Sequence, residues 1–270
     1  MKPSFVAPEL AGLGDASALF NRLGERRLEV YRELENRRTF RFEHNGRHYF
    51  AKQHFGVGWR EIFKNLLSFR LPVLGASNEW DAIAHLERLG INTLHAVAFA
   101  EAGRNPARRQ SYIVTRALEN TLSLEDLARA GPIPQGRRRR LIRAVAQITR
   151  TMHQGGMNHR DLYICHFHLA AGSEVDRPRL YLIDLHRAQI RRRTPYRWRL
   201  KDIAGLLFST LDFEFTQRDY LLFVTAYSGK PLRQSLTEEG QFWRDVVKRA
   251  GRLYQRESGV VPRRLQEMWL

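Results

Sequence analysis

Cysteine is almost missing from the sequence. Cys165 is the only one in 270 residues, so an intramolecular disulfide and a zinc site built on cysteines are both excluded. A chain with a single thiol is compatible with a reducing compartment, and we expect the cytoplasm.

Long apolar runs are missing as well. No segment approaches the roughly 20 apolar residues that span a bilayer, and residues 1–20 contain an early proline and acidic residues where a signal peptide would be apolar. We therefore expect no export signal, and we expect any contact with a membrane to be peripheral.

Acidic residues are scarce relative to basic ones. The 28 Asp and Glu stand against 45 Lys and Arg, which gives a net charge of +17, while a hydrophobic content of 43% is ordinary for a folded soluble protein. This excess of positive charge favours an anionic partner. Nucleic acid, an anionic membrane, a phosphorylated glycolipid and an acidic protein all fit, and charge alone does not choose among them.

The N-terminal part of the chain has the patterns of a sheet with one helix. Alternating residues around Asn45-Gly46 predict a hairpin over 38–53, because this dipeptide suits a type I′ turn. Apolar residues at helical spacing predict a helix over 75–90, and strands are expected over 94–100 and 111–118.

After residue 118 the pattern is mainly helical. Helices are predicted over 123–130 and 135–156, and a short strand pair ends at 179–185. We predict an α+β, bilobal, protein-kinase-like fold, with a small β-rich N-lobe and N-terminal extension in 1–117 and a larger, mainly helical C-lobe in 118–270. A ligand cleft is expected between the lobes.

Four side chains suited to phosphoryl transfer follow one another in a familiar order. Lys52 lies on an expected strand, Glu79 on the next helix, Asp161 in a loop that reads His-Arg-Asp, and Asp184 directly after an apolar strand. In kinases these positions hold the lysine for the nucleotide phosphates, its glutamate partner, the aspartate that orients the acceptor hydroxyl and a Mg²⁺ ligand. Taken alone, each of these residues could have an ordinary structural role. Only their order along the chain makes the pattern specific for a kinase.

A glycine-rich phosphate loop is missing. Glu35, Asn36 and Arg37 stand between the first two expected strands, so side chains would replace the usual backbone N–H groups. Gly56 and Gly58 come after the lysine strand, and we interpret them as a turn.

The second departure from the protein-kinase pattern is His166. It stands five residues after Asp161, where that pattern has a metal-binding asparagine. We expect His166 either to ligate the metal beside Asp184 or to form a hydrogen bond with Asp184 or Asp161. Asp184-Leu185-His186 replaces the usual Asp-Phe-Gly and lacks its glycine hinge, so a constitutively assembled site is expected.

Three longer motifs resemble the lipopolysaccharide core heptose kinases of Gram-negative bacteria, and the heptose(I) kinase branch in particular. They are NHRDLYICHF at 158–167, IDLHRAQ at 183–189 and RWRLKDIAGL at 197–206. The resemblance implies phosphorylation of the 4-hydroxyl of the first core heptose, dependent on ATP and Mg²⁺, at the cytoplasmic face of the inner membrane.

The same resemblance implies a role for each site residue. Asp161 would be the catalytic aspartate, Lys52 and Glu79 the nucleotide-binding pair, and Asp184 a metal ligand, with His166 as a family trait and candidate second ligand. The implied acceptor carries lipid A phosphates and sugar-acid carboxylates, which agrees with the basic charge of the chain.

Two alternatives stay open. The acceptor could be another core sugar, either a second heptose or an octulosonic acid. A nucleic-acid-binding protein with a kinase-like fold is the more distant alternative, suggested by the basic runs at 137–140 and 191–199, although we expect no nucleic acid partner because Lys52, Asp161 and Asp184 are intact. An acidic protein partner is not excluded.

The segment 58–75 has apolar residues at helical spacing with cations beside them. Trp59 and Phe63 stand near Arg60 and Lys64. This pattern is typical of a helix in a membrane interface, and also of an ordinary packed helix with a basic rim.

Overall fold

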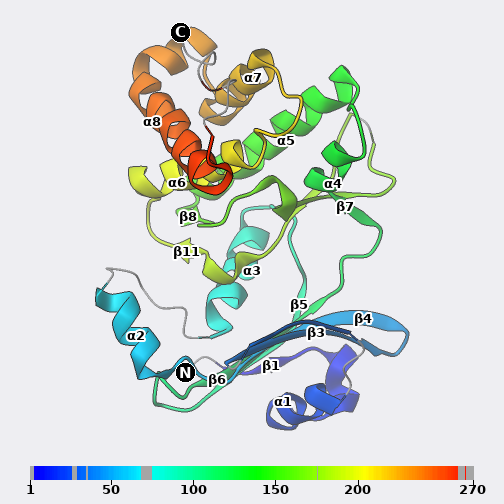
Figure 1. Ribbon diagram of the computed structural model, residues 1–270. Coiled ribbons are helices and arrows are strands. Elements are labelled where there is room, and N and C mark those ends of the chain that lie inside the picture. Colours follow the sequence, from blue (N-terminus) through cyan, green and yellow to red (C-terminus); the bar gives the residue numbers. More distant parts are fainter. Residues whose placement is uncertain are drawn as a thin grey trace. The chain divides into compact units, whose positions relative to one another are not determined.

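The computed structural model describes residues 3–25, 29–34, 36–67, 75–174, 176–260 and 265. The chain forms two compact units, shown in Figure 1. Unit 1 comprises residues 1–85, 94–119 and 185–187, and unit 2 comprises residues 86–93, 120–184 and 188–270.

Unit 1 contains a six-stranded antiparallel sheet of strand order β1-β5-β6-β4-β3-β2. The strands are β1 (Phe5–Val6), β2 (Glu29–Leu34), β3 (Arg37–His44), β4 (Arg47–His54), β5 (Ala96–Ala102) and β6 (Gln110–Arg116). The hairpin predicted from Asn45-Gly46 is confirmed. It joins β3 to β4, and both turn residues have positive φ angles, 50° and 70°, as a type I′ turn requires.

One face of this sheet is covered by the N-terminal segment, which lies beneath the strands in Figure 1. The segment forms the short helix η1 (Pro8–Leu13) and the helix α1 (Ala16–Glu25). Their buried leucines pack on apolar strand residues in one core: Leu10, Leu13, Leu19 and Leu23 with Phe40, Phe42, Tyr49, Ala51, Val97, Ala98, Tyr112 and Val114.

The opposite face of the sheet receives α3 (Ser77–Arg88). Trp80 of α3 stacks on the buried Phe99 of β5, with ring centroids 5.1 Å apart. The helix α2 (Gly58–Leu67) begins where Gly58 N donates to Ala107 O in the β5–β6 loop.

Unit 2 is mainly helical. Its helices are α4 (Leu124–Arg129), α5 (Gln135–Gln154), α6 (Tyr196–Phe208), α7 (Gln217–Ser228) and α8 (Leu232–Ser258). The last four helices share a core that contains Ala146, Ile203, Ala204, Val224, Tyr227, Phe242, Trp243, Val246 and Ala250. Two small antiparallel sheets complete the unit, β7 (Thr121–Ser123) with β9 (Phe167–Ala170) and β10 (Leu180–Leu182), and β8 (Met157–Asn158) with β11 (Gln189–Ile190).

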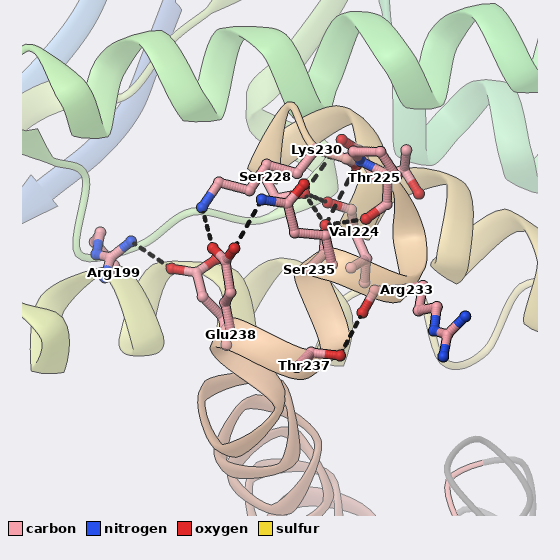
Figure 2. A network of polar contacts seen from close by, with 12 residues as sticks. Arg199, Val224, Thr225, Ser228, Lys230, Arg233, Ser235, Thr237 and Glu238 are labelled. Atoms are coloured by element: carbon pink, nitrogen blue, oxygen red, sulfur yellow. Dashed lines mark hydrogen bonds and ion pairs between the residues drawn. The ribbon is translucent and has the colours of Figure 1, made fainter.

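Figure 2 shows the polar network that closes the turn between α7 and α8. Gly229 ends α7 in the left-handed conformation, with φ 67°. The hydroxyl of Ser228, the last residue of α7, is hydrogen-bonded to that of Ser235 on α8 at 2.6 Å, and Lys230 pairs with Glu238. This network links the end of α7 to the first turns of α8.

None of the helices within the described ranges combines the length and the apolar character that crossing a membrane requires.

Candidate active site

Unit 1 contributes a lysine–glutamate ion pair. Lys52 Nζ on β4 lies 2.7 Å from Glu79 Oε1 in the first turn of α3. The glutamate side chain is 1% exposed and the lysine side chain 15% exposed. The predicted pairing of these two side chains is confirmed.

The strand register explains how the pair forms. Side chains alternate along β4, so Ala51 enters the core under α1 while Lys52 points to the other face of the sheet. Lys52 shares a cross-strand row with Phe99, on which Trp80 stacks. The packing of α3 on that row brings Glu79 to the lysine.

The second carboxylate oxygen of Glu79 is outside this ion pair. Glu79 Oε2 is buried and has no hydrogen-bond partner among the described residues. An unpaired buried carboxylate oxygen is unfavourable, and its place near the positive N-terminal end of α3 offsets part of that cost.

The strand connections in unit 1 replace a glycine-rich loop. Two residues connect β2 to β3, of which Glu35 lies outside the described residues, while the Asn36 carbonyl accepts from Phe55 N at 3.0 Å and Arg37 opens β3. Gly56 lies in the short connection between β4 and α2, Gly58 is the first residue of α2, and both have positive φ angles, 95° and 72°. A Cβ at Gly56 would lie 2.7 Å from Ala107 O, so the close approach of the β5–β6 loop requires glycine there.

Unit 2 contributes the His-Arg-Asp loop, and a buried aspartate on α6 holds its backbone. Asp202 is fully buried, and its two carboxylate oxygens accept from His159 N at 2.6 Å and from Arg160 N at 2.8 Å. Arg160 has a φ of 77°, a conformation that costs roughly 1–2 kcal/mol for a residue with a Cβ. The two hydrogen bonds stabilise that conformation and so fix the direction in which the chain enters Asp161.

A histidine and a tyrosine complete the surroundings of Asp202. His153 Nε2 lies 3.2 Å from Asp202 Oδ2, and His153 Nδ1 lies 2.9 Å from the Tyr227 hydroxyl. Because a carboxylate only accepts, Nε2 carries a proton, and in the neutral ring Nδ1 accepts from the tyrosine. Burial raises the pKa of Tyr227 to about 12, so its hydroxyl keeps the proton this bond needs.

His159 is neutral. Its Nε2 lies 2.9 Å from the Ile183 carbonyl, so Nε2 donates, and Nδ1 has no partner among the described residues. Complete burial lowers the pKa of His159 below its ordinary value, although Asp202 acts in the opposite direction. The ring stacks on His166 with centroids 5.5 Å apart and connects the loop to the segment before Asp184.

His166 lies between the two candidate acids. Its Nδ1 donates to the Asp161 carbonyl oxygen at 2.8 Å, so in the neutral ring Nε2 carries a lone pair. This Nε2 lies 3.6 Å from Asp184 Oδ2. An imidazole lone pair that faces a carboxylate oxygen suits a shared cation.

Asp184 leaves the strand-end segment with a φ of 60°, a left-handed conformation that aspartate tolerates better than most residues. Unit 2 thus brings Asp161, His166 and Asp184 together, while Lys52 and Glu79 lie together in unit 1. The described residues contain no group of three or more His, Cys, Asp or Glu side chains that could hold a metal.

The role of Asp202 was missed in the sequence. The residue stands inside one of the motifs quoted above, in the apolar stretch DIAGLL of α6. A lone acid among apolar helical residues is itself a signal, because a buried carboxylate requires hydrogen-bond partners. Those partners are backbone groups more than 40 residues away, and no local sequence pattern identifies them.

The sheet unit with its lysine–glutamate pair and the helical unit with its aspartate loop are the parts of a protein-kinase-like phosphotransferase. The chain belongs to the lipopolysaccharide kinase (Kdo/WaaP) family, whose model matches residues 21–227. It is therefore a kinase, and membership of a kinase family implies that it uses ATP.

Individual relatives are similar over most of their length. The lipopolysaccharide core heptose(I) kinase WaaP of Pseudomonas aeruginosa is 50% identical over 235 residues, which cover 85% of this chain and 88% of that protein. The protein of the same name from Escherichia coli K12 is 47% identical, with coverage of 84% and 88%. A solved structure of WaaP in complex with acyl carrier protein has a TM-score of 0.81 and 40% identity, and covers 94% of this chain and 100% of that one. The predicted family and fold class are confirmed.

Proposed function

We propose that this chain transfers the γ-phosphoryl group of ATP to the 4-hydroxyl of the first heptose of the lipopolysaccharide core. The observation that carries the proposal is the 47–50% identity to relatives named heptose(I) kinase, over 84–85% of this chain. These relatives are not named for a second heptose or an octulosonic acid, and their names favour the first heptose as acceptor.

In the proposed reaction, the heptose hydroxyl oxygen attacks the γ-phosphorus of ATP, and the bond from that phosphorus to the β–γ bridging oxygen breaks. ADP leaves, and the hydroxyl proton passes to the Asp161 carboxylate and then to solvent. Lys52 binds the nucleotide phosphates, and Glu79 fixes the lysine through the 2.7 Å ion pair. Asp202 is a positioning residue, because it holds the backbone that carries Asp161.

We assign the Mg²⁺ ligands to Asp184 and His166. The Asp184 carboxylate supplies the oxygen that Mg²⁺ prefers, and His166 Nε2 faces it with a lone pair because Nδ1 donates elsewhere. Two protein ligands suit Mg²⁺, which usually keeps waters and binds phosphate oxygens at its other positions. When bound, the ion would neutralise charge on the transferring phosphoryl group.

The proposal is tested with core glycolipid from cells that lack this protein. Incubation with the protein, ATP and Mg²⁺ should add the mass of one phosphate to a heptose. Asp161→Ala should lower turnover on the order of 100-fold or more, the usual range for a general base, while nucleotide binding is kept. Asp176→Ala, at an exposed aspartate of unit 2, is the matched control. Addition of phosphate to another sugar would refute the acceptor assignment.

We also propose peripheral contact with an anionic membrane through α2. Its side chains Trp59, Phe63 and Leu67 are 49%, 56% and 81% exposed, and the exposed cations Arg60 and Lys64 lie beside them. The rings of Trp59 and Phe63 stack at 5.7 Å and form one apolar surface, whereas Ile62 packs inward. The remainder of the segment, 68–74, lies outside the described residues.

Liposomes test this contact. Trp59→Ser with Phe63→Ser should weaken binding to anionic vesicles and slow transfer to intact glycolipid, with transfer to a delipidated core fragment little changed. Val260→Ser, at another exposed apolar residue, should have no effect. Equal loss with both acceptors, together with a lower Tm, would show that α2 only packs on unit 1.

An acyl carrier protein is the acidic partner that we propose, by analogy with the WaaP complex. The net charge of +17 suits an acidic protein, and unit 2 contains an apolar cavity of about 100 Å³, with room for only part of an acyl chain. Residues that line it include Leu141, Val145, Ile203, Leu207, Phe223 and Val246. Mixing with acylated and unacylated carrier protein tests this, because only the acylated form should raise the Tm strongly.

A further inference from the structure

The sheet of unit 1 carries a second cation on the face of Lys52. In the β3–β4 ladder Arg37 stands directly opposite His54, and Lys52 is two residues before His54 on the same strand. Opposite residues share a face of a sheet, as do residues two apart on a strand, so these three side chains lie on one face. Arg37 and Lys52 are diagonal neighbours, about 7–8 Å apart and within reach of each other's long side chains.

The next arginine, Arg38, lies on the opposite face. It stands opposite Gln53, whose amide donates to the Phe20 carbonyl of α1. Its guanidinium lies 2.6 Å from a Glu33 carboxylate oxygen and 5.5 Å from the centroid of the Phe55 ring. Arg38 is therefore paired with an acid and an aromatic ring inside unit 1.

Arg37 has neither kind of partner among the described residues. Its side chain is half-buried, and its Nε is fully buried and donates to no acceptor there. No acid within the described ranges forms an ion pair with its guanidinium. A partly buried cation without an acceptor is unfavourable, so the protein gains stability if an anion joins it.

The charges that act on His54 are of one sign. The pKa of His54 is lowered to about 3, and burial is the largest cause. The positive charges of Arg37 and Lys52 lower this pKa further, as does His186, which also belongs to unit 1. The end of the sheet face beside Lys52 is thus cationic around a neutral imidazole.

Arg37 also stands where a protein kinase has its phosphate loop. Two residues connect β2 to β3, and Arg37 is the first residue of β3. In protein kinases this connection is glycine-rich and covers the phosphates, while the strand lysine pairs with the α- and β-phosphates. A connection of two residues offers few backbone N–H groups, whereas one guanidinium supplies five donors.

We propose that Arg37 binds the β- and γ-phosphates of ATP in place of a glycine-rich loop. The inference rests on the proposed function, in which Lys52 binds the same phosphate chain. The strand register fixes Arg37 beside Lys52 on the side of the β2–β3 connection, so the phosphates beyond those held by the lysine fall to Arg37. A planar guanidinium matches phosphate oxygens and bonds two of them at once.

The test is nucleotide binding by Arg37→Gln in the absence of any acceptor. The Kd for Mg-ATP should rise about tenfold or more, because charge-assisted hydrogen bonds to phosphate are lost. AMP lacks the β- and γ-phosphates, so its Kd should change less than about twofold. Arg37→Lys keeps the charge and loses the fork, and its Kd for Mg-ATP should lie between those of wild type and Arg37→Gln.

Two further measurements separate binding from structure and nucleotide from acceptor. Because Arg37 has no acid partner to lose within the described residues, the Tm of Arg37→Gln without nucleotide should stay within about 2 °C of wild type. In steady-state transfer to intact glycolipid, the KM for ATP should rise with the Kd, and the KM for the glycolipid should change less than about twofold.

Arg38→Gln is the matched control. It removes the same charge from the adjacent residue, on the opposite face of the sheet. Its Tm should fall, since the pair with Glu33 and the contact with Phe55 are lost, while its Kd for Mg-ATP should change less than about twofold.

Three results would overturn the inference. They are an Arg37→Gln variant that binds Mg-ATP as tightly as wild type, an equal loss of affinity for AMP, and a rise confined to the KM for the glycolipid, which would assign Arg37 to the acceptor. Failure of the proposed function looks different, because the wild-type protein would then bind Mg-ATP and transfer no phosphate to any heptose.

Discussion

Replacing Asp202 with asparagine should disable the chain without changing any residue that touches a substrate. The carboxylate accepts from His159 N at 2.6 Å and from Arg160 N at 2.8 Å. Asparagine has nearly the same shape, but one oxygen becomes an NH₂ group that only donates. One of the two backbone N–H groups is then buried against another donor.

The magnitude follows from these contacts. Loss of one hydrogen bond to a charged group removes roughly 1.5–3 kcal/mol, and the orphaned buried N–H adds roughly 1–3 kcal/mol. Part of this is recovered if the loop shifts, so we expect a loss of about 3 kcal/mol in the free energy of unfolding. A shift of the loop displaces Asp161, and a misplacement of about 1 Å lowers a rate on the order of 100-fold.

Urea unfolding and steady-state kinetics check the two effects together. For Asp202→Asn, kcat should fall on the order of 100-fold while the KM for ATP changes less than about twofold, since Lys52, the lysine that we propose binds the nucleotide, lies in unit 1. Asp212→Asn is the matched control, because this exposed carboxylate accepts a hydrogen bond, at 2.6 Å, only from the Tyr254 hydroxyl among the described residues. A variant that keeps wild-type kcat and stability would refute the view that Asp202 holds the loop.

Three further substitutions test the ion pair, the backbone packing and the pH dependence of stability. Glu79→Gln should lower kcat/KM for ATP at least tenfold by weakening the hold on Lys52, and a structure with the ion pair broken but full activity would contradict this. Gly156→Ala should destabilise the protein by more than about 3 kcal/mol or abolish folding, because the added Cβ would lie 1.9 Å from Arg191 O; a Tm within 2 °C of wild type, on the order of 1 kcal/mol or less, would contradict the packing. His54 is neutral in the fold, since burial lowers its pKa to about 3, so acidification protonates only the unfolded chain. Stability should therefore fall by about 2 kcal/mol from pH 7 to pH 5 on account of His54. Urea melts at both pH values should show a shallower pH dependence for His54→Asn.

Much of the fold was predictable from the sequence wherever an element depends only on residues close to one another in the chain. Asn45-Gly46 specifies its turn by backbone conformation alone, and Ser123 caps α4 by accepting from Asp126 N at 3.0 Å. The order of lysine, glutamate and two aspartates along the chain identified the kinase pattern, because each residue type stands on a recognisable element.

The N-terminal segment was not predictable in the same way. The sequence suggested only an extension before the β-rich lobe, yet Leu10, Leu13, Leu19 and Leu23 are buried and close the core of the sheet. The six residues of η1 and ten of α1 are too short to be stable alone, so their structure depends on strands that follow later in the chain.

In the candidate site, too, some contacts were predictable from the sequence and others were not. Lys52 and Glu79 could be paired from their elements, because a strand lysine and the next helix have few ways to meet. The convergence of Arg160 with Arg197 on Trp198 joins residues almost 40 positions apart, and only the tertiary structure shows it. The basic run was visible in the sequence, but its focus on one ring was not.

The placement of Trp198 and Asp202 on one helix has a consequence for how this enzyme can diverge. The two lie four residues apart, roughly 6 Å along a stiff rod, with Asp202 inside the protein and the first turn of α6 near solvent. Substitutions at exposed Arg197 change the surface of that first turn and leave the loop anchor intact. The exposed turn of α6 can therefore vary residue by residue while the same helix continues to hold the His-Arg-Asp loop through Asp202.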